Sequence, residues 1–310
     1  MKAICETWSA ELLANEQPRR THDKRPRKLF HLDKWSGQTR IGNTRSAVGK
    51  TEKYMILKSV RLAVLNLSLV GLLGSFSWAQ PTKAAACSIT TLHQRYGFAI
   101  NGTSNGNPFT AVGQIATDGN GTLAGNETIS DNGSVGNLLK VLGKYSINSN
   151  CTGTMTIQAQ GRSKQNFDIT VISDGTQIDM IQNDSGTTIL GTAQAQVSKS
   201  CSLAGVKGTY SLQGGGTEIG VGPLAVAGQI RLRGDGTLDG TATVSINGSV
   251  ASKQKISGAY KILRICQGAA EIQVGNKGPI GLTLVVVNGE QKVLFIEGDA
   301  NTLLSGSLQR

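Results

Sequence analysis

Apolar and polar residues alternate with a period of two along the second part of this chain. From Leu224 to Leu232 every second residue is apolar or glycine, while Gln229 and Arg231 lie between them. This alternation is typical of a half-buried β-strand. Similar runs predict strands over residues 167–172, 241–246 and 282–287. No segment after residue 80 has the apolar stripe of an amphipathic helix, so we expect an all-β protein.

Short turn signals separate these runs, and they are typical of β-hairpins. They are Asp131-Asn132-Gly133, Asp174-Gly175, Asn247-Gly248 and Asn288-Gly289. Connections this short force neighbouring strands to be antiparallel. We expect about eight short strands in each of two repeated units. A sandwich stays an alternative, but a closed barrel leaves no exposed edge strand, so the prediction is two small antiparallel barrels.

The two units are visible as a repeat at an offset of about 114 residues, which is the size of a domain. Matching landmarks keep their order along the chain. They include Tyr96 with Tyr210, Gly113-Gln114-Ile115 with Gly228-Gln229-Ile230, and Tyr145 with Tyr260. We place the first unit at residues 80–198 and the second at 199–310.

Cysteines repeat at the same offset and predict one disulfide inside each unit. The predicted bonds are Cys87–Cys151 and Cys201–Cys266, although four cysteines allow three connectivities. Ala84-Ala85-Ala86 before Cys87 leaves a lipidated cysteine as an alternative. Against it, Pro81-Thr82-Lys83 interrupts the preceding apolar run, and Cys201 lies in mid-chain.

The chain carries a net charge of +11, and most of this charge lies outside the two units. Residues 1–79 hold 14 of the 31 basic and 6 of the 20 acidic residues, which gives them +8 and leaves +3 for residues 80–310. A basic run of this kind is typical of a solvated tail. We therefore expect no nucleic-acid partner for the folded part, which lacks a dense basic face with stacking aromatics.

Residues 55–79 have the pattern of a secretory signal peptide. Lys58 and Arg61 precede an apolar run from Leu62 to Trp78, and Ser77-Trp78-Ala79 fits a cleavage site. We expect cleavage near Ala79 and a secreted or periplasmic protein that meets the membrane only through this peptide. A membrane anchor is the alternative reading. Residues 1–54 are then a disordered basic extension or precede the true start at Met55.

A single sixteen-stranded outer-membrane barrel is a further alternative. Such a wall needs an outward apolar band and aromatic girdles, whereas aromatic residues form 5% of this chain. The outward positions also carry residues such as Arg231 and Thr241. Two separate barrels therefore remain the prediction.

Candidate catalytic residues are few, and we expect no enzymatic activity, no cofactor and no metal. His93 is the single histidine after residue 80, and the second unit has Lys207 or its neighbour instead. Aligning the two units by offset pairs no acid with another acid. The alignment pairs Asp118 with Arg233, Glu127 with Ala242, Asp168 with Leu282, and Glu297 with Asn183.

Three further motifs have structural interpretations. Asp118-Gly119-Asn120-Gly121 resembles the start of a calcium loop, but its counterpart begins with Arg233, so we expect a tight turn. The run 214–216 is three glycines without a following Lys-Ser/Thr, which predicts a hairpin tip and not a phosphate loop. The repeated tyrosines Tyr96, Tyr145, Tyr210 and Tyr260 are expected to be buried.

The segments Tyr96-Gly97-Phe98, Ala111-Val112-Gly113-Gln114-Ile115 and Gly143-Lys144-Tyr145 resemble those of uncharacterised exported β-proteins of bacteria. The resemblance covers residues 87–310 and implies no activity. An eight-stranded meander of this size is also similar in architecture to the calycin barrels, which include the lipocalins. The folded part has no lipocalin Gly-x-Trp signature, so no binding residue is carried over.

The sequence leads to two hypotheses about function. The first is a secreted, non-catalytic module that binds a small apolar ligand inside a barrel. The second is a structural or interaction protein of the cell envelope that uses its outer β-surface, with avidity from two linked units. An enzyme with a small barrel pocket ranks third. The oligomeric state stays open.

Overall fold

The structure is a computed structural model of the chain, and it describes residues 86–172 and 174–310. These residues belong to one compact unit, Ser77–Arg310. The predicted signal peptide at 55–79 and the extension at 1–54 lie outside the described residues. No helix in the described part of the chain is long and apolar enough to cross a membrane.

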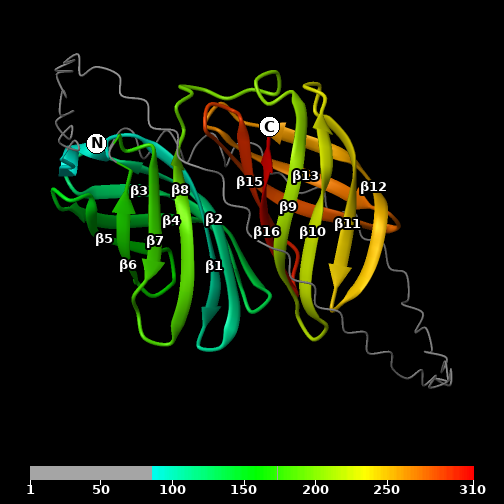
Figure 1. Cartoon of the computed structure of the whole chain (residues 1–310), viewed down its shortest axis with the longest axis horizontal. Coiled ribbons are helices and arrows are strands. Elements are labelled where there is room, and N and C mark those ends of the chain that lie inside the picture. Colours follow the sequence, from blue (N-terminus) through cyan, green and yellow to red (C-terminus); the bar gives the residue numbers. More distant parts are fainter. Residues whose placement is uncertain (1–85, 173) are drawn as a thin grey trace, which may run out of the picture. The chain divides into compact units, whose positions relative to one another are not determined.

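The fold is all-β and consists of two closed antiparallel barrels of eight strands each, in tandem (Figure 1). This confirms the predicted fold class. The alternatives of a sandwich and of one sixteen-stranded barrel are wrong, because β8 pairs with β1 and β16 pairs with β9. The first barrel contains β1 (Arg95–Ser104), β2 (Asn107–Thr117), β3 (Thr122–Asp131), β4 (Ser134–Ile147), β5 (Thr152–Ala159), β6 (Gln165–Val171), β7 (Gln177–Gln182) and β8 (Thr187–Ala195).

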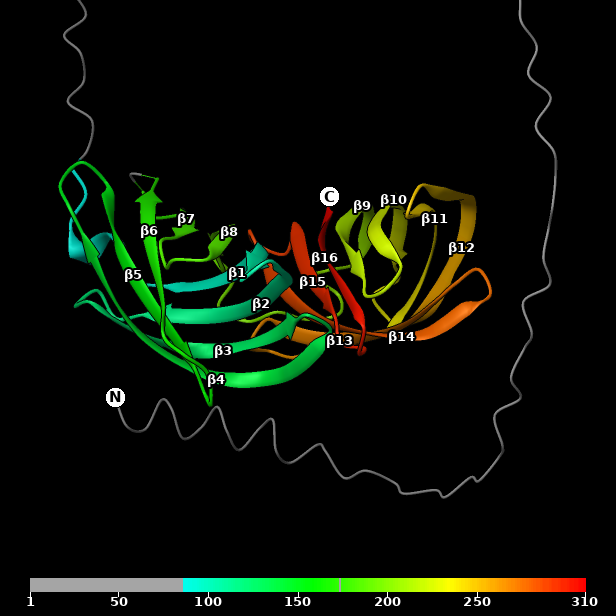
Figure 2. The same ribbon diagram turned by 90° about the horizontal axis from the view of Figure 1, so that it is seen from below.

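The second barrel repeats this order of strands, and each strand pairs with its neighbour in the chain (Figure 2). Its strands are β9 (Gly208–Glu218), β10 (Gly222–Leu232), β11 (Thr237–Ile246), β12 (Ser249–Ile262), β13 (Gln267–Val274), β14 (Lys277–Val287), β15 (Lys292–Glu297) and β16 (Thr302–Gln309). One short 3₁₀ helix, η1 (Ile89–Thr91), precedes β1.

Asparagine and glycine form the tight hairpin turns that the sequence predicts. Asn132 and Gly133 have φ angles of 50° and 80°, and Asn247 and Gly248 have 48° and 81°. Positive φ at both central residues is the geometry whose twist matches that of the flanking strands. These turns fix the register of β3 with β4 and of β11 with β12.

The run of three glycines at 214–216 is not a hairpin tip, which corrects the sequence interpretation. It lies inside β9 and pairs with both β10 and β16. A Cβ atom on Gly216 would lie 1.6 Å from the backbone oxygen of Leu303. Glycine is required here because the backbones of β9 and β16 approach too closely for a side chain.

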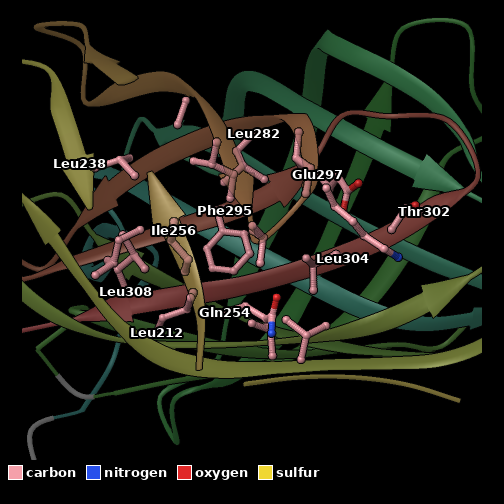
Figure 3. Close-up of a pocket in the computed structure, with 18 of the residues that line it drawn as sticks. Leu212, Leu238, Gln254, Ile256, Leu282, Phe295, Glu297, Thr302, Leu304 and Leu308 are labelled. Atoms are coloured by element: carbon pink, nitrogen blue, oxygen red, sulfur yellow. The ribbon is translucent and has the colours of Figure 1, made fainter. Parts of the chain in front are cut away.

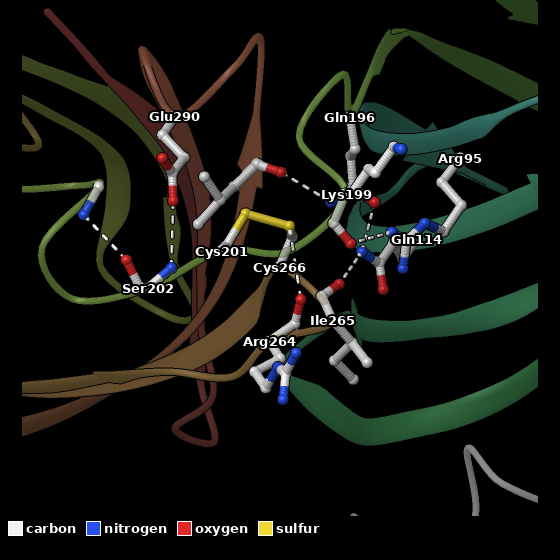
Figure 4. The surroundings of a disulfide bond; sticks show 12 residues. Arg95, Gln114, Gln196, Lys199, Cys201, Ser202, Arg264, Ile265, Cys266 and Glu290 are labelled. Atoms are coloured by element: carbon white, nitrogen blue, oxygen red, sulfur yellow. Dashed lines mark hydrogen bonds between the residues drawn. A yellow bond between two sulfur atoms is a disulfide. The ribbon is translucent and has the colours of Figure 1, made fainter.

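Each barrel is closed at one end by the segment that precedes its first strand. The structure forms both predicted disulfides, and each joins this segment to a turn between two strands of its barrel. The Cα atoms of Cys87 and Cys151 are 5.0 Å apart, and those of Cys201 and Cys266 are 4.9 Å apart. Figure 4 shows the bond between Cys201 and Cys266. Because Cys87 is bonded to Cys151, it has no thiol for a lipid, which counts against the lipoprotein alternative.

The four repeated tyrosines are buried, as predicted, and their hydroxyls help to hold the closed ends. Tyr145 donates to the backbone oxygen of Leu92 at 2.7 Å, and Tyr210 donates to that of Val206 at 2.8 Å. Leu92 and Val206 are themselves fully buried. The closing segment of each barrel is therefore anchored by a disulfide and a tyrosine hydrogen bond.

The two barrels contact each other through an apolar cluster on their outer faces. It contains Val112 of the first barrel and, from β14 and β15, Val285, Val287, Leu294 and Ile296. The strand predicted over 282–287 is therefore buried on both faces from residue 284 onward, and not half-buried as expected. The alternation signal fails there because β14 packs against a second barrel as well as against its own core.

Polar side chains surround this cluster and pair across the contact. The amide of Gln114 donates to the backbone oxygen of Ile265 at 2.6 Å, and that of Gln196 donates to the oxygen of Val286 at 2.6 Å (Figure 4). Asn126 and Gln267 pair through their side-chain amides. Since buried amides are costly without partners, this seam specifies how the barrels join.

Candidate functional site

The interior of the second barrel contains a cavity of about 540 Å³ (Figure 3). Side chains from all eight strands line it, and most are aliphatic. They include Leu224, Val226, Ile272, Leu282, Leu304 and Phe295. A concave apolar space of this volume falls in the usual range for small-molecule sites, about 300–1,000 Å³.

The residues at matching positions of the two barrels explain why the second interior is hollow. Phe167 pairs with Met155 in the first barrel, and Leu282 pairs with Ala270 at the same position of the second. Phenylalanine and methionine are thus replaced by leucine and alanine on adjacent strands. The smaller side chains leave unfilled the volume that Phe167 and Met155 occupy.

A second group of substitutions acts in the same direction near the other end of the barrel. In the first barrel Phe109 pairs with Gly102 on the neighbouring strand, and in the second Leu224 pairs with Gly216. The interior position of Ile100 is taken by Gly214. The ring of Phe295 fills part of this space, because a Cβ atom on Gly214 would lie 3.1 Å from the tip of the ring.

Solvent exposure follows this difference in packing. In the first barrel Phe167, Ile157 and Ile189 are 0%, 0% and 1% exposed. Their counterparts Leu282, Ile272 and Leu304 are only partly buried, although they face the interior of the second barrel. These aliphatic side chains therefore lie against solvent unless an apolar molecule covers them.

The cavity is closed at the disulfide end and reaches the opposite end of the barrel. Buried Leu232, Leu238 and Leu308 line its closed end, beneath the segment that Cys201 anchors. The other end is formed by the hairpin turns, and we call it the mouth. Its lining residues are polar and exposed or partly buried: Ser249, Asn276, Lys277 and Thr302.

Glu297 is the acidic side chain that lines the cavity, and it lies at the end of β15 near the mouth. The residue is 6% exposed. Burial raises the pKa of its carboxyl to about 7, and the nearby carboxylates of Asp299 and Glu218 act in the same direction. Figure 3 shows Glu297 among the lining side chains with Thr302 and Leu304.

The first barrel has a neutral amide at the position of Glu297. Gln182 pairs with Phe167, just as Glu297 pairs with Leu282. Gln182 accepts a hydrogen bond from Gln165 at 3.3 Å and donates one to Asp184 at 2.8 Å. The amide is therefore satisfied inside its own barrel, and its position is not available as a binding group.

A second buried acid, Glu127, lies inside the first barrel on β3. It is 0% exposed, and neither of its carboxylate oxygens has a hydrogen-bond partner among the described residues. Burial raises the pKa of Glu127 to about 7, against a smaller opposing effect of Arg162. The period-two pattern of β3 could have revealed this acid, since Leu123 and Ile129 share its inward face.

The pairing of acids derived from a constant offset needs correction. The strand ladders align Glu297 with Gln182 and not with Asn183, and they align Leu282 with Phe167 and not with Asp168. The offset is 114 residues for β1 and 115 for the strands from β2 onward, and a slip of one reverses the face of every side chain.

With the corrected alignment, one acid does recur in both barrels. Asp184 accepts a hydrogen bond from the backbone N–H of Asn166 at 2.8 Å, and Asp299 accepts one from that of Gly281 at 3.1 Å. Each aspartate thus fixes the turn after β7 or β15 to the strand before it, β6 or β14. In the first barrel Asp184 has this structural role. In the second barrel Asp299 has the same role and also places a carboxylate near Glu297.

The other candidate residues have local structural roles. Asp118 caps a tight turn, as predicted, because it accepts hydrogen bonds from the backbone of Asn120 and from the backbone and hydroxyl of Thr122. The Thr122 hydroxyl and these N–H groups lower the pKa of Asp118 to about 2. His93 Nδ1 lies 2.9 Å from the backbone oxygen of Asp118. Among the described residues, no three His, Cys, Asp or Glu side chains are grouped to hold a metal.

Comparison with known proteins does not assign this chain to a family. No protein-family model matches the chain, and no curated protein matches it. A protein of unknown function from the DUF3598 family of Nostoc punctiforme is a structural neighbour, with 9% sequence identity and a TM-score of 0.21. The match covers 72% of this chain and 99% of that chain. A TM-score this low does not establish a shared fold, so the similarity to calycins stays a prediction.

Proposed function

We propose that this protein is an exported, non-catalytic binding module whose second barrel holds a small apolar ligand. The observation that supports the proposal is the contrast between two interiors with the same strand order. Aromatic and methionine side chains fill the first barrel, whereas the second keeps a cavity of about 540 Å³ lined by partly exposed aliphatic side chains. Covering those side chains would stabilise a complex by the hydrophobic effect.

The first barrel then serves as a packed support that buries one outer face of the second. Its contact covers β14 and β15, the strands that carry Leu282, Phe295 and Glu297. A site built on rigid strands keeps its shape without a ligand, which favours binding. The two disulfides indicate an oxidising compartment, which agrees with the proposed export.

The experiment compares ligand binding with the cavity open and filled. Titration of the purified full chain with the neutral probe N-phenyl-1-naphthylamine should give a saturable rise in fluorescence. In the double variant Ala270→Met with Leu282→Phe, affinity should fall at least tenfold, because these side chains fill the same positions in the first barrel. Ala269→Met on the outer face of the same strand is the matched control and should bind like the parent chain.

A second measurement keeps the proposal testable if the double variant folds poorly. Methyl-labelled leucine and valine spectra of the parent chain should shift at Leu282 and Leu304 when dodecanol is added, and not at Val171 in the core of the first barrel. Unchanged probe binding in a folded double variant would overturn the proposal. So would the absence of both probe binding and methyl shifts in the parent chain.

A further inference from the structure

The cavity of the second barrel combines an apolar interior with one buried acid, and this combination narrows the class of ligand. Glu297 and Lys277 are the two charged residues in its lining. Glu297 is 6% exposed, whereas Lys277 is exposed at the first position of β14. The acid is therefore buried in the wall of the barrel, and the lysine is an exposed residue at the mouth.

The carboxylate of Glu297 has no partner within the part of the chain that the structure describes. None of the ion pairs there involves it, and no hydrogen bond from a described residue reaches its carboxylate. A buried carboxylate is costly unless a charge or hydrogen-bond donor satisfies it. The first barrel avoids this cost with Gln182, whose amide is hydrogen-bonded on both sides. The second barrel thus holds an acid that a ligand can satisfy.

Charges around Glu297 favour a cation over an anion. Two further carboxylates, Glu218 at the end of β9 and Asp299 in the turn after β15, act on it electrostatically. The neighbouring strand β14 contributes Lys277, an exposed residue that forms no ion pair with a described acid. Three acids against one exposed lysine give the mouth a negative potential, which attracts a cationic head group.

We propose that the second barrel binds an amphiphile with a protonated primary amine, whose ammonium pairs with Glu297 while its apolar chain lies in the cavity. The chain would extend from the mouth toward Leu238 and Leu308 at the closed end. Ammonium donors and a carboxylate form charge-assisted hydrogen bonds, which are stronger than neutral ones. This inference rests on the proposed function, because it presupposes that the cavity is a binding site.

The test uses three ligands with the same alkyl chain and different head groups: dodecylamine, dodecanol and dodecanoate. Each displaces N-phenyl-1-naphthylamine from the purified full chain at pH 8 and low salt, below the micelle concentration. Dodecylamine should bind at least tenfold more tightly than dodecanol, and dodecanoate more weakly than dodecanol. In Glu297→Gln the preference for dodecylamine should disappear while dodecanol binding stays the same.

Glu271→Gln is the matched control, since it removes the same charge from the exposed outer face of β13. This variant should keep the preference for dodecylamine. A change of pH supplies a second readout, because an alkylamine stays protonated below pH of about 10, like lysine. Protonation of Glu297 should weaken dodecylamine binding between pH 8 and pH 5 and leave dodecanol binding unchanged.

The outcomes separate this inference from the proposed function. If none of the three ligands binds, the proposed function fails. If dodecanol binds but dodecylamine gains nothing, or keeps its advantage in Glu297→Gln, only the inference about the amine is overturned. A preference for dodecanoate that Lys277→Gln removes would also overturn it, and would assign the head group to the lysine.

Discussion

Ala270 occupies in the second barrel the position that Met155 occupies in the first. Each residue pairs with a buried tyrosine on the neighbouring strand, Ala270 with Tyr260 and Met155 with Tyr145. Met155 is 1% exposed and belongs to a continuous core, whereas Ala270 borders the cavity. At these equivalent positions the two barrels thus have the same strand pairing but interior side chains of different size.

Reciprocal substitutions at this pair should have opposite effects on stability. Met155→Ala should lower the free energy of unfolding by about 2–5 kcal/mol, because it removes core contacts and leaves a cavity. Ala270→Met should leave it unchanged or raise it, because the new side chain enters existing space. Urea denaturation followed by circular dichroism measures both. Equal losses in the two variants would show that the second interior is already filled.

Glu127 should make the stability of the first barrel depend on pH. Its folded pKa of about 7 lies above its ordinary value of 4.5, so the folded state holds the proton more tightly. The stabilisation is complete below pH of about 4.5 and is lost as pH rises through 7, in total on the order of 3 kcal/mol. Glu127→Gln has no such proton to lose. Between pH 5 and pH 8 the free energy of unfolding of Glu127→Gln should therefore rise relative to that of the parent chain.

Glu297 requires a control in this measurement, since its pKa is also raised to about 7. The comparison is best made in a Glu297→Gln background, so that one buried acid titrates. If the chains with and without the Glu127→Gln substitution differ by a constant free energy from pH 5 to pH 8, the prediction is contradicted. Such a result would mean that the carboxyl has the same pKa in the folded and unfolded chains.

The disulfides should contribute a large share of each barrel's stability. Replacing Cys201 and Cys266 by alanine opens a loop of 65 residues and should lower the free energy of unfolding by about 4 kcal/mol. The corresponding pair Cys87 and Cys151 closes 64 residues and should behave alike. Denaturation with and without a reductant tests both pairs. If a reductant leaves the parent chain's transition in place, these bonds do not stabilise the fold.

Gly97 should be essential for the contact between the barrels. A side chain at this position would collide with the methyl groups of Val285 and Val287 from the second barrel. Gly97→Val should therefore cost about 1–3 kcal/mol and turn one calorimetric transition into two. Ser211 occupies the equivalent position of the second barrel and is exposed, so Ser211→Val is the control. A single unshifted transition in Gly97→Val would contradict the prediction, because the contact between the barrels would then accommodate the added side chain.

The sequence by itself determined the repeated framework of this protein. Two eight-stranded units could be predicted from period-two alternation, Asn-Gly turns and two cysteine pairs at nearly equal spacing. The strand and turn signals are local, and the cysteine signal depends only on which two thiols react with each other. The same alternation could have revealed that Glu127 faces inward. It could not reveal that residues 284–287 are covered on both faces, since that burial comes from another barrel.

The tertiary structure alone decided which barrel is hollow. The cavity could not be predicted from any single position, because Leu282 and Ala270 are residue types that are common in a packed core. The empty volume arises where several smaller side chains from separate strands meet, and the ladder register decides which of them meet. A shift of one residue also concealed the equivalence of Glu297 and Gln182. The interior volume depends on side chains from strands that are far apart in the sequence, whereas each strand or turn signal depends on a few neighbouring residues.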